Sequence, residues 1–455
     1  MPLLGWRYTG RLSMLEPGFA GPTNALQHRS LMVASSPPSS AARTQARADD
    51  DPLVPDRGPL AWAIRGSLLL AASLTVMAGA VISPSLPELQ AHFADVDNAG
   101  LWTRLVLTVP ALFIAGFAPV AGWVIDRFGR KSMIVVGAVL YGLSGASGLV
   151  VDSLWAILVG RAALGLSVAM VMTTAQTLVG DYFQGPRRER FLGIQSAFMA
   201  FGGVAFLLAG GFLADLHWRG PFAVYLAALL LAPVMAFVLP EPPRHDPAAV
   251  AGRGADAAAP PEPARMPVAF VAGLYATAFF TMTTFFMVPT QLPFYLEELG
   301  VDSPSRTGMA IACFNLSAGL ASMSYGRLRQ WLGPPALFAI GFACMAAGYG
   351  LIAAAGSYGV VMVALALAGP SMGINMPNAS VWLLARVPPA VRGRALGGLT
   401  TSLFLGQFVS PLASQPVVAA FGPGTAFAVV AALAATATAT FLGAALWTRS
   451  AGAPT

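Results

Sequence analysis

The sequence is poor in charge. Asp, Glu, Lys and Arg make up 10% of its 455 residues, whereas 56% of the residues are hydrophobic. A soluble domain carries about 25% charged residues, because its surface faces water. A chain of this length with so few charges cannot cover a soluble surface, so we expect lipid to cover most of it.

Several kinds of site are missing as well. The sequence has one lysine, Lys131, and no phosphate-binding loop of the form G-x-x-x-x-G-K-[ST], which argues against transport driven by ATP. Cys313 and Cys344 lie in apolar runs without neighbouring histidines, as is typical of buried thiols and not of metal ligands. No nucleophile–base pair appears, and the basic residues form no single patch. We therefore expect no enzyme activity, no cofactor, no metal and no nucleic-acid partner.

In place of charge, the sequence has a series of apolar runs. From Leu68 onward they recur at a length of about 20 residues, enough to cross a hydrocarbon core ~30 Å thick. The pattern predicts an all-α membrane protein with twelve transmembrane helices. The predicted spans are 67–87, 105–125, 132–151, 153–175, 191–212, 220–240, 268–293, 307–326, 335–356, 358–378, 397–418 and 424–446.

The segments outside the spans are polar. Residues 1–60 are rich in Arg, Ser, Pro and Asp, and are expected to form a disordered cytoplasmic tail. Residues 241–266 are predicted to form a cytoplasmic linker, and residues 449–455 a C-terminal tail. The predicted domains are then an N-terminal six-helix bundle at 61–240 and a C-terminal one at 267–448.

Basic residues are distributed unevenly between the predicted loops. Cytoplasmic loops of membrane proteins carry an excess of Lys and Arg. With the N-terminus inside, the inner loops hold Arg127, Arg130, Lys131, Arg187, Arg188, Arg190, Arg244, Arg253, Arg265, Arg327, Arg329, Arg386, Arg392 and Arg394, and the outer loops hold Arg104, Arg219 and Arg306. This asymmetry predicts that both termini are cytoplasmic and that the protein lies in a plasma membrane, which we expect to be a bacterial inner membrane.

The two halves of the sequence also resemble each other. An offset of 204 residues brings Gly122 onto Gly326, Gly202 onto Gly406, and the run beginning at Arg188 onto the run beginning at Arg392. A shared offset predicts two pseudo-symmetric six-helix halves related by an axis along the membrane normal. In that arrangement a substrate binds between the halves near the bilayer midplane.

The loop between the second and third predicted spans carries the most specific motif. It reads Gly122-Trp123-Val124-Ile125-Asp126-Arg127-Phe128-Gly129-Arg130-Lys131. Gly122 permits close helix packing, Gly129 permits a tight turn, and Asp126 can cap a helix or pair at its end. The motif resembles the G-x-x-x-D-R-x-G-R-K signature of the major facilitator superfamily. The resemblance implies a clasp in which Asp126 and Arg130 hold the cytoplasmic side closed; the alternative is that the cluster only sets topology.

Arg161 is a basic residue well inside an apolar run, about nine residues into the fourth predicted span. A charge at that depth costs several kcal/mol unless it faces a cavity or a partner, so we predict a place on the substrate or proton pathway. Its position resembles that of the span-four arginine of the superfamily, which is linked there to proton transfer or substrate orientation. The alternative is an arginine that reaches the interface or neighbouring carbonyls.

The fifth predicted span bears on the subfamily. Drug antiporters of the superfamily carry G-x-x-x-G-P-x-x-G-G there. This sequence keeps Gly202, Gly210 and Gly211 but has Phe206 and Leu207 in place of Gly-Pro. The glycines are predicted to serve helix packing, which ordinary close packing also explains, so an antiporter assignment stays open.

No Asp or Glu lies near the middle of a predicted span, so proton coupling is left open. The spans instead contain neutral polar residues, which could line the pathway or bridge helices. Those predicted on the pathway are Thr108, Gln195, Gln291, Asn315, Asn375, Asn378 and Gln407.

The resemblance implies an efflux-type, drug/proton antiporter-like secondary transporter. Its expected mechanism is export of a small amphipathic compound by rocker-switch alternating access. The alternative is an importer or facilitator of a small organic solute, with Arg161 meeting an anionic group. The expected partners are a small-molecule substrate, the lipid bilayer and, if transport is coupled, protons; we expect a monomer.

Overall fold

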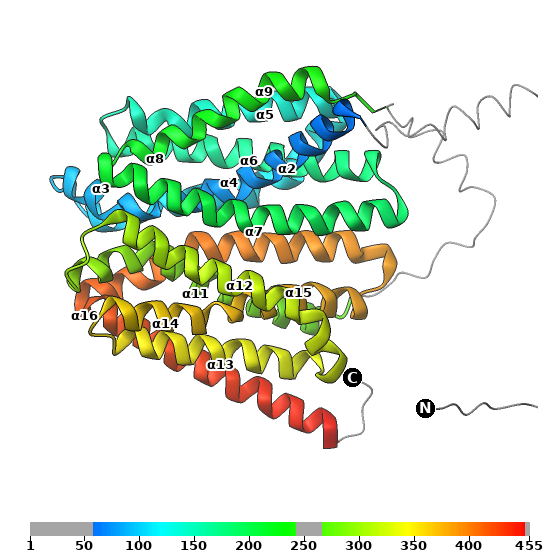
Figure 1. Cartoon of the computed structure of the whole chain (residues 1–455). Coiled ribbons are helices and arrows are strands. Elements are labelled where there is room, and N and C mark those ends of the chain that lie inside the picture. The colour runs from blue at the N-terminus through cyan, green and yellow to red at the C-terminus, as the bar shows by residue number, and fades with distance from the viewer. Residues whose placement is uncertain (1–57, 243–265, 451–455) are drawn as a thin grey trace, which may run out of the picture. The chain divides into compact units, whose positions relative to one another are not determined.

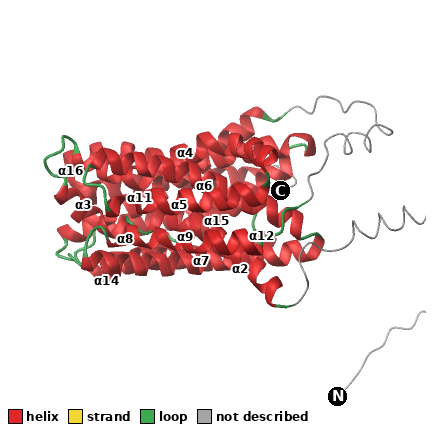
Figure 2. Ribbon diagram, turned by 90° about the horizontal axis from the view of Figure 1, so that it is seen from above, coloured by secondary structure: helices red, strands yellow, loops and turns green. Residues whose placement is uncertain are grey.

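The computed structural model describes residues 58–242 and 266–450, and the helices of these two ranges are labelled in Figure 1. No strand occurs within them, and the helices lie alongside one another (Figure 2). The prediction of an all-α fold is confirmed. Most of the predicted tails at 1–60 and 449–455 and of the linker at 241–266 lies outside the described residues, so the predicted domain limits remain predictions.

The helices before residue 243 form the N half. Several begin with a proline in their first turn, where its missing N–H leaves no helical hydrogen bond unmade. The elements are α2 (Pro59–Ala80), η1 (Ser83–Ser85), α3 (Leu86–His92), α4 (Ala99–Phe128), α5 (Arg130–Gly145), η2 (Ala146–Leu149), α6 (Leu154–Tyr182), α7 (Gly185–Leu216), α8 (Gly220–Ala223), η3 (Val224–Leu226) and α9 (Ala227–Val238).

The helices from residue 268 onward form the C half. They are α11 (Val268–Glu298), α12 (Pro304–Trp331), α13 (Pro334–Ala353), α14 (Tyr358–Ala368), α15 (Pro370–Arg386), η4 (Pro389–Val391) and α16 (Arg392–Ser450). The last of these is two helices joined at Gly422, whose φ of 81° lies in the left-handed region that glycine adopts without steric cost.

Ten helical segments of the described residues are long and apolar enough to cross a membrane. The predicted twelve spans differ from this number for two reasons. The segment Pro389–Trp447 contains both of the last two predicted spans, because the two helices are joined by a single non-helical residue, Gly422. The helix α12, which matches the eighth span, is long enough but carries several polar and basic residues, including Asn315 and Arg327. The twelve-helix fold is therefore as predicted.

The helices run between two ends of the molecule. The α3 end holds α3, α8 and the turn at Gly422, and the tail end holds the limits of the described chain at residues 58, 242, 266 and 450 (Figure 1). Each half has its own hydrophobic core. Phe294 of α11 belongs to the N-half core and Leu207 of α7 to the C-half core, so side chains from each half are buried in the other.

Candidate functional site

The junction between the halves is formed mainly by α7 against α12 and by α4 against α16. Close approach depends on glycine. A Cβ on Gly211 would lie 2.8 Å from the Pro304 carbonyl oxygen, and a Cβ on Gly308 would lie 2.7 Å from the Leu207 carbonyl oxygen. Both positions are near the α3 end, so small residues allow the two backbones to meet there.

Polar contacts across the junction lie at the same end. The Ser83 hydroxyl donates to the Pro289 carbonyl. The Asp215 carboxylate of α7 accepts from the Ser305 backbone N–H at 3.1 Å and from the Ser303 hydroxyl at 3.3 Å. These hydrogen bonds between the halves hold the α3 end together.

The most extensive of these contacts centres on Arg104 of α4, which is 3% exposed. Its Nε donates to Gln291 Oε1 of α11 at 2.8 Å, and its Nη1 donates to Gln90 Oε1 at 2.9 Å and to the Gly100 carbonyl at 2.6 Å. The guanidinium carbon lies 3.6 Å from the centroid of the Phe294 ring. In the described ranges no carboxylate forms an ion pair with Arg104, so its charge is buried among neutral partners.

The hydrogen bonds around Arg104 continue through Gln291 to the helix α16. Gln291 is fully buried and donates through Nε2 to the Ser414 hydroxyl of α16 at 2.8 Å. A polar cavity of about 360 Å³ adjoins the group and is lined by Arg104, Phe294, Glu297 and Glu298, among others. The sequence pattern places Arg104 in an outer loop, just before an apolar run that begins at residue 105. In the structure the helix begins six residues earlier, at Ala99, and Arg104 is a buried residue of that helix.

The tail end has a different set of contacts around the signature motif. The Arg130 Nε lies 3.0 Å from Asp181 Oδ2 at the end of α6. The Glu241 carboxylate accepts from the backbone N–H groups of Arg130 and Lys131 at 2.8 and 2.9 Å, at the start of α5. A carboxylate at a helix N-terminus is stabilised by the helix dipole. All of these contacts lie within the N half.

The other motif residues are placed as follows. Gly129 has a φ of 92° and is the single residue between α4 and α5, a turn that suits glycine. A Cβ on Gly122 would meet no atom within 4 Å, so no close helix approach occurs there. Arg127 lies over the Trp123 ring at 5.9 Å. The side chain of Asp126 lies outside the described residues, so the predicted Asp126–Arg130 clasp stays a prediction.

Arg161 is fully buried inside the N half. Its guanidinium donates to the Gly145 carbonyl and lies 5.1 Å from the Phe222 ring and 4.8 Å from the Tyr225 ring. Its Nε and Nη1 have no hydrogen-bond partner among the described residues. None of these contacts reaches the C half, so the structure does not bring Arg161 to the junction. Its place on a substrate or proton pathway stays a prediction.

The predicted neutral polar residues fall into three groups. Gln291 and Gln407 lie at the junction; a Cβ on Gly79 of α2 would lie 3.4 Å from Gln407 Nε2 of α16. Thr108 and Gln195 are buried in the N half, and the Thr108 hydroxyl has no partner among the described residues.

The remaining three lie in the C half, and two of them contact a neighbouring helix. Asn315 Nδ2 donates to the Ile311 carbonyl of its own helix at 2.9 Å. Asn375 packs against Gly341 of α13, and Asn378 donates to the Pro334 carbonyl at 2.9 Å. Of the glycines predicted to pack helices in the fifth span, Gly210 and Gly202 differ: a Cβ on Gly210 would lie 2.3 Å from the Val81 carbonyl, whereas one on Gly202 would have an ordinary contact with Ser73.

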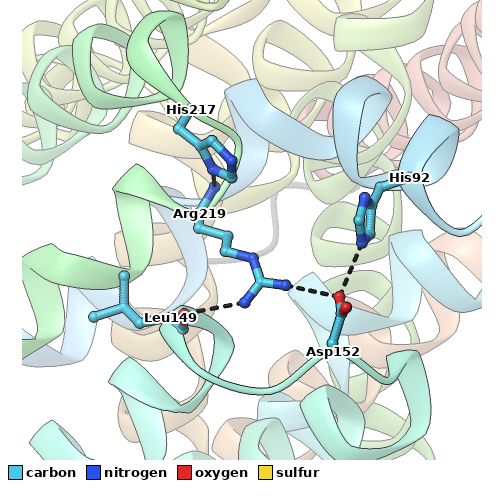
Figure 3. Close-up of polar contacts among 5 residues, drawn as sticks. All are labelled: His92, Leu149, Asp152, His217 and Arg219. Carbon is cyan, nitrogen blue, oxygen red and sulfur yellow. Dashed lines mark hydrogen bonds and ion pairs between the residues drawn. The ribbon is translucent and has the colours of Figure 1, made fainter.

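A group of polar side chains at the α3 end joins three segments of the N half (Figure 3). Asp152 lies 3.0 Å from His92 Nε2 and 2.7 Å from Arg219 Nη2, and Arg219 also donates to the Leu149 carbonyl. The hydrogen bond with His92, followed by the charge of Arg219, lowers the pKa of the Asp152 carboxyl. No local sequence pattern connects these residues, because His92 and Arg219 are 60 and 67 residues from Asp152.

Helices in two halves of six spans around a central junction define a twelve-span membrane transporter fold. The family model described as Major Facilitator Superfamily matches residues 68–305 and 274–455. The chain belongs to this superfamily, whose members are transporters and not enzymes. The resemblance inferred from the signature motif is therefore confirmed.

Relatives of known activity are distant. The tetracycline resistance protein, class C, of Escherichia coli is 27% identical over 344 residues, which cover 75% of this chain and 86% of that protein. The cis,cis-muconate transport protein of Acinetobacter baylyi is 25% identical over 345 residues, covering 73% and 81%. The puromycin resistance protein of Streptomyces alboniger is 30% identical over 175 residues, covering 38% of this chain and 34% of that protein, so the match spans about a third of its length.

Two solved structures have the same fold. The D-xylose-proton symporter matches with a TM-score of 0.67 at 18% identity, over 84% of this chain and 97% of that chain. A bacterial homolog of the human lysosomal transporter Spinster, in an inward-facing and unoccupied conformation, matches with a TM-score of 0.63 at 20% identity, over 86% and 96%.

Proposed function

We propose that the protein is a secondary transporter that exports a small amphipathic compound by alternating access. The observation that carries the proposal is the position of the polar contacts between the halves. They gather at the α3 end and centre on Arg104, Gln291 and Ser414. Hydrogen bonds of this kind can be exchanged for bonds to water, so the halves can part at this end while each keeps its own core.

The tail end is assigned to the cytoplasm. It carries most of the basic residues, including Arg127, Arg188, Arg327 and Arg392, whereas the α3 end carries Glu88, Asp152, Asp215, Glu297 and Asp302. Positive charge on the inner side supports this orientation. The contacts at the α3 end then close the pathway toward the outside, in a state from which the substrate site would be reached from the cytoplasm.

Export is favoured by the relatives, several of which are named for resistance to tetracycline, puromycin or several drugs. The polar groups at the junction are also mainly neutral, as Gln291, Gln407 and Ser414 are. Neutral hydrogen-bonding groups beside aromatic rings suit a compound that is part apolar and part polar.

Import of a small organic anion is a second candidate. It is favoured by Arg104, whose guanidinium has no carboxylate partner among residues 58–242 and 266–450 and would be released into the pathway when the α3 end opens. The muconate transport protein among the relatives is named for a dicarboxylate. Arg104 takes the part in this candidate that the sequence suggested for Arg161.

Transport in proteoliposomes tests the proposal. Tetracycline, puromycin and cis,cis-muconate are the first probes, each measured with and without a pH gradient. The matched control is the variant Asp215→Cys/Ser305→Cys, because the Ser305 hydroxyl donates to the Asp215 carboxylate across the junction and a disulfide between these two positions would hold the halves together.

We expect tetracycline or puromycin to move faster with the wild-type protein than with the oxidised control, and reduction to restore movement in the control. Movement of muconate alone would favour the anion importer. Movement of a probe at the same rate with the oxidised and reduced control would contradict alternating access at this junction.

A further inference from the structure

A second cavity lies on the C half, away from the junction. Its volume is about 600 Å³, within the usual range of ligand sites. It lies between α11, α13, α15 and the last part of α16, and its walls are almost entirely apolar. Several wall residues, among them Gly273, Leu433 and Thr436, are exposed at the surface of helices that cross the membrane, so the groove opens toward lipid.

Aromatic rings form one wall of this groove. Phe270, Phe280, Phe342, Trp382 and Phe441 all line it. The Phe270 and Trp382 rings meet edge to face with centroids 5.0 Å apart, and the Phe342 and Phe441 rings stack at 5.8 Å. Rings that hold one another in place form a firm surface against which an acyl chain makes more van der Waals contacts than it does with mobile lipid.

Part of the groove is kept open by glycine. A Cβ on Gly273 of α11 would meet no atom within 4 Å, so a larger side chain there would extend into the groove without disturbing the packed helices.

The side chain of Arg386 lies where the groove reaches the tail end. The guanidinium carbon of Arg386, at the last residue of α15, lies 5.7 Å from the centroid of the Phe270 ring, and its side chain is exposed. No Asp or Glu follows Asp302 in the sequence, so Arg386, Arg392 and Arg394 have no acidic neighbour on the helices α12 to α16. Basic pockets between membrane helices on the cytoplasmic side attract anionic headgroups.

The N half provides a natural comparison. A groove of about 510 Å³ lies between α2, α7 and α9, and its lining includes Gly66, Leu70, Leu230 and Val234. Phe206 is the aromatic residue that lines it. A Cβ on Gly66 would also meet nothing within 4 Å, so the two grooves have a comparable opening but differ in their aromatic wall.

We propose that the C-half groove binds one anionic glycerophospholipid of the tail-end leaflet. One acyl chain lies along the aromatic wall, and the headgroup phosphate meets Arg386. Lipid tails are as apolar as the groove, so hydrophobicity does not select the lipid. Selection comes from the shape of the wall for the chain and from the arginine for the charge.

Quenching of Trp382 by brominated lipid tests this site in the full-length protein, reconstituted in phosphatidylcholine vesicles. The signal of Trp382 is obtained as the difference between each protein and the same protein with Trp382→Phe. We expect half-maximal quenching at about fivefold lower mole fraction of dibrominated phosphatidylglycerol than of dibrominated phosphatidylcholine, the preference that one arginine near the surface would provide.

Three variants separate the contribution of the arginine from that of the groove. Arg386→Gln should remove the preference between the two lipids and keep the quenching. Gly273→Leu should fill the groove and reduce the quenching of Trp382 by both lipids, whereas the matched variant Gly66→Leu in the other groove should leave it unchanged. Equal quenching of the wild type by the two lipids, or unchanged quenching in Gly273→Leu, would overturn the proposal.

Discussion

Replacement of Gln291 by leucine is expected to open the α3 end. In the closed state Gln291 accepts the Arg104 Nε–H at 2.8 Å, and both side chains are buried. Leucine has a similar size and cannot accept, so the guanidinium loses that bond while it remains enclosed. In the open state water reaches Arg104, and the substitution costs little there. The change therefore acts on one state of the equilibrium.

The magnitude follows from the charge on the donor. A hydrogen bond to a charged group contributes about 1.5–3 kcal/mol, and each 1.4 kcal/mol changes an equilibrium constant tenfold. The ratio of open to closed α3 ends should rise roughly 10- to 100-fold. Spin labels at Val150 and Ser357, which lie in exposed loops of the two halves at this end, report the ratio as a distance distribution.

The control is Gln291→Glu, which keeps an acceptor for Arg104 and adds a counter-charge. Its α3 end should stay closed. The reasoning would be refuted if the leucine variant kept the wild-type distance distribution, or if the glutamate variant opened as far as the leucine variant.

Three further changes test other contacts. Gly211→Val should push α7 away from the Pro304 carbonyl and open the α3 end, at a cost of about 1–3 kcal/mol to the closed state. Gly193→Val on the same helix should leave the α3 end closed, because a Cβ there would meet nothing within 4 Å. The same spin labels measure both variants. The lowered pKa of Asp152 means that its contribution to stability is present above the ordinary carboxyl range and lost as the pH falls through the lowered pKa; thermal unfolding of Asp152→Asn should lack that acid-side step. Glu241→Gln should lower the free energy of unfolding by about 0.3–1 kcal/mol at low salt and less at high salt, because α5 loses a carboxylate at its N-terminus.

The fold could be predicted well from the sequence, because the length and spacing of apolar runs report directly on helices that cross a bilayer. Gly129 and its neighbours in the signature motif identified the family, because the turn between the two helices requires particular residues at fixed spacing. Helix limits were less accurate. The helix α4 begins at Ala99 and not at 105, and the polar residues Thr103 and Arg104 of its first turns are buried.

The contacts could not be predicted, because they join residues far apart in the sequence. Arg104 and Gln291 are 187 residues apart, and no local pattern relates them. Arg161, by contrast, was singled out by the sequence, but its contacts were not. Its depth in an apolar run suggested the substrate pathway, but aromatic rings of the same half surround it. A sequence records that a charge is buried, and only the packing determines which surface it meets.

Alternating access predicts that the two ends of the molecule open in turn. The most direct test measures both ends in the same preparation, with labels at Val150 and Ser357 for the α3 end and at Glu189 and Trp331 for the tail end, all exposed positions. In Gln291→Leu the first distance should lengthen and the second should shorten, in the same fraction of molecules. A lengthening at the α3 end with no change at the tail end would contradict the account.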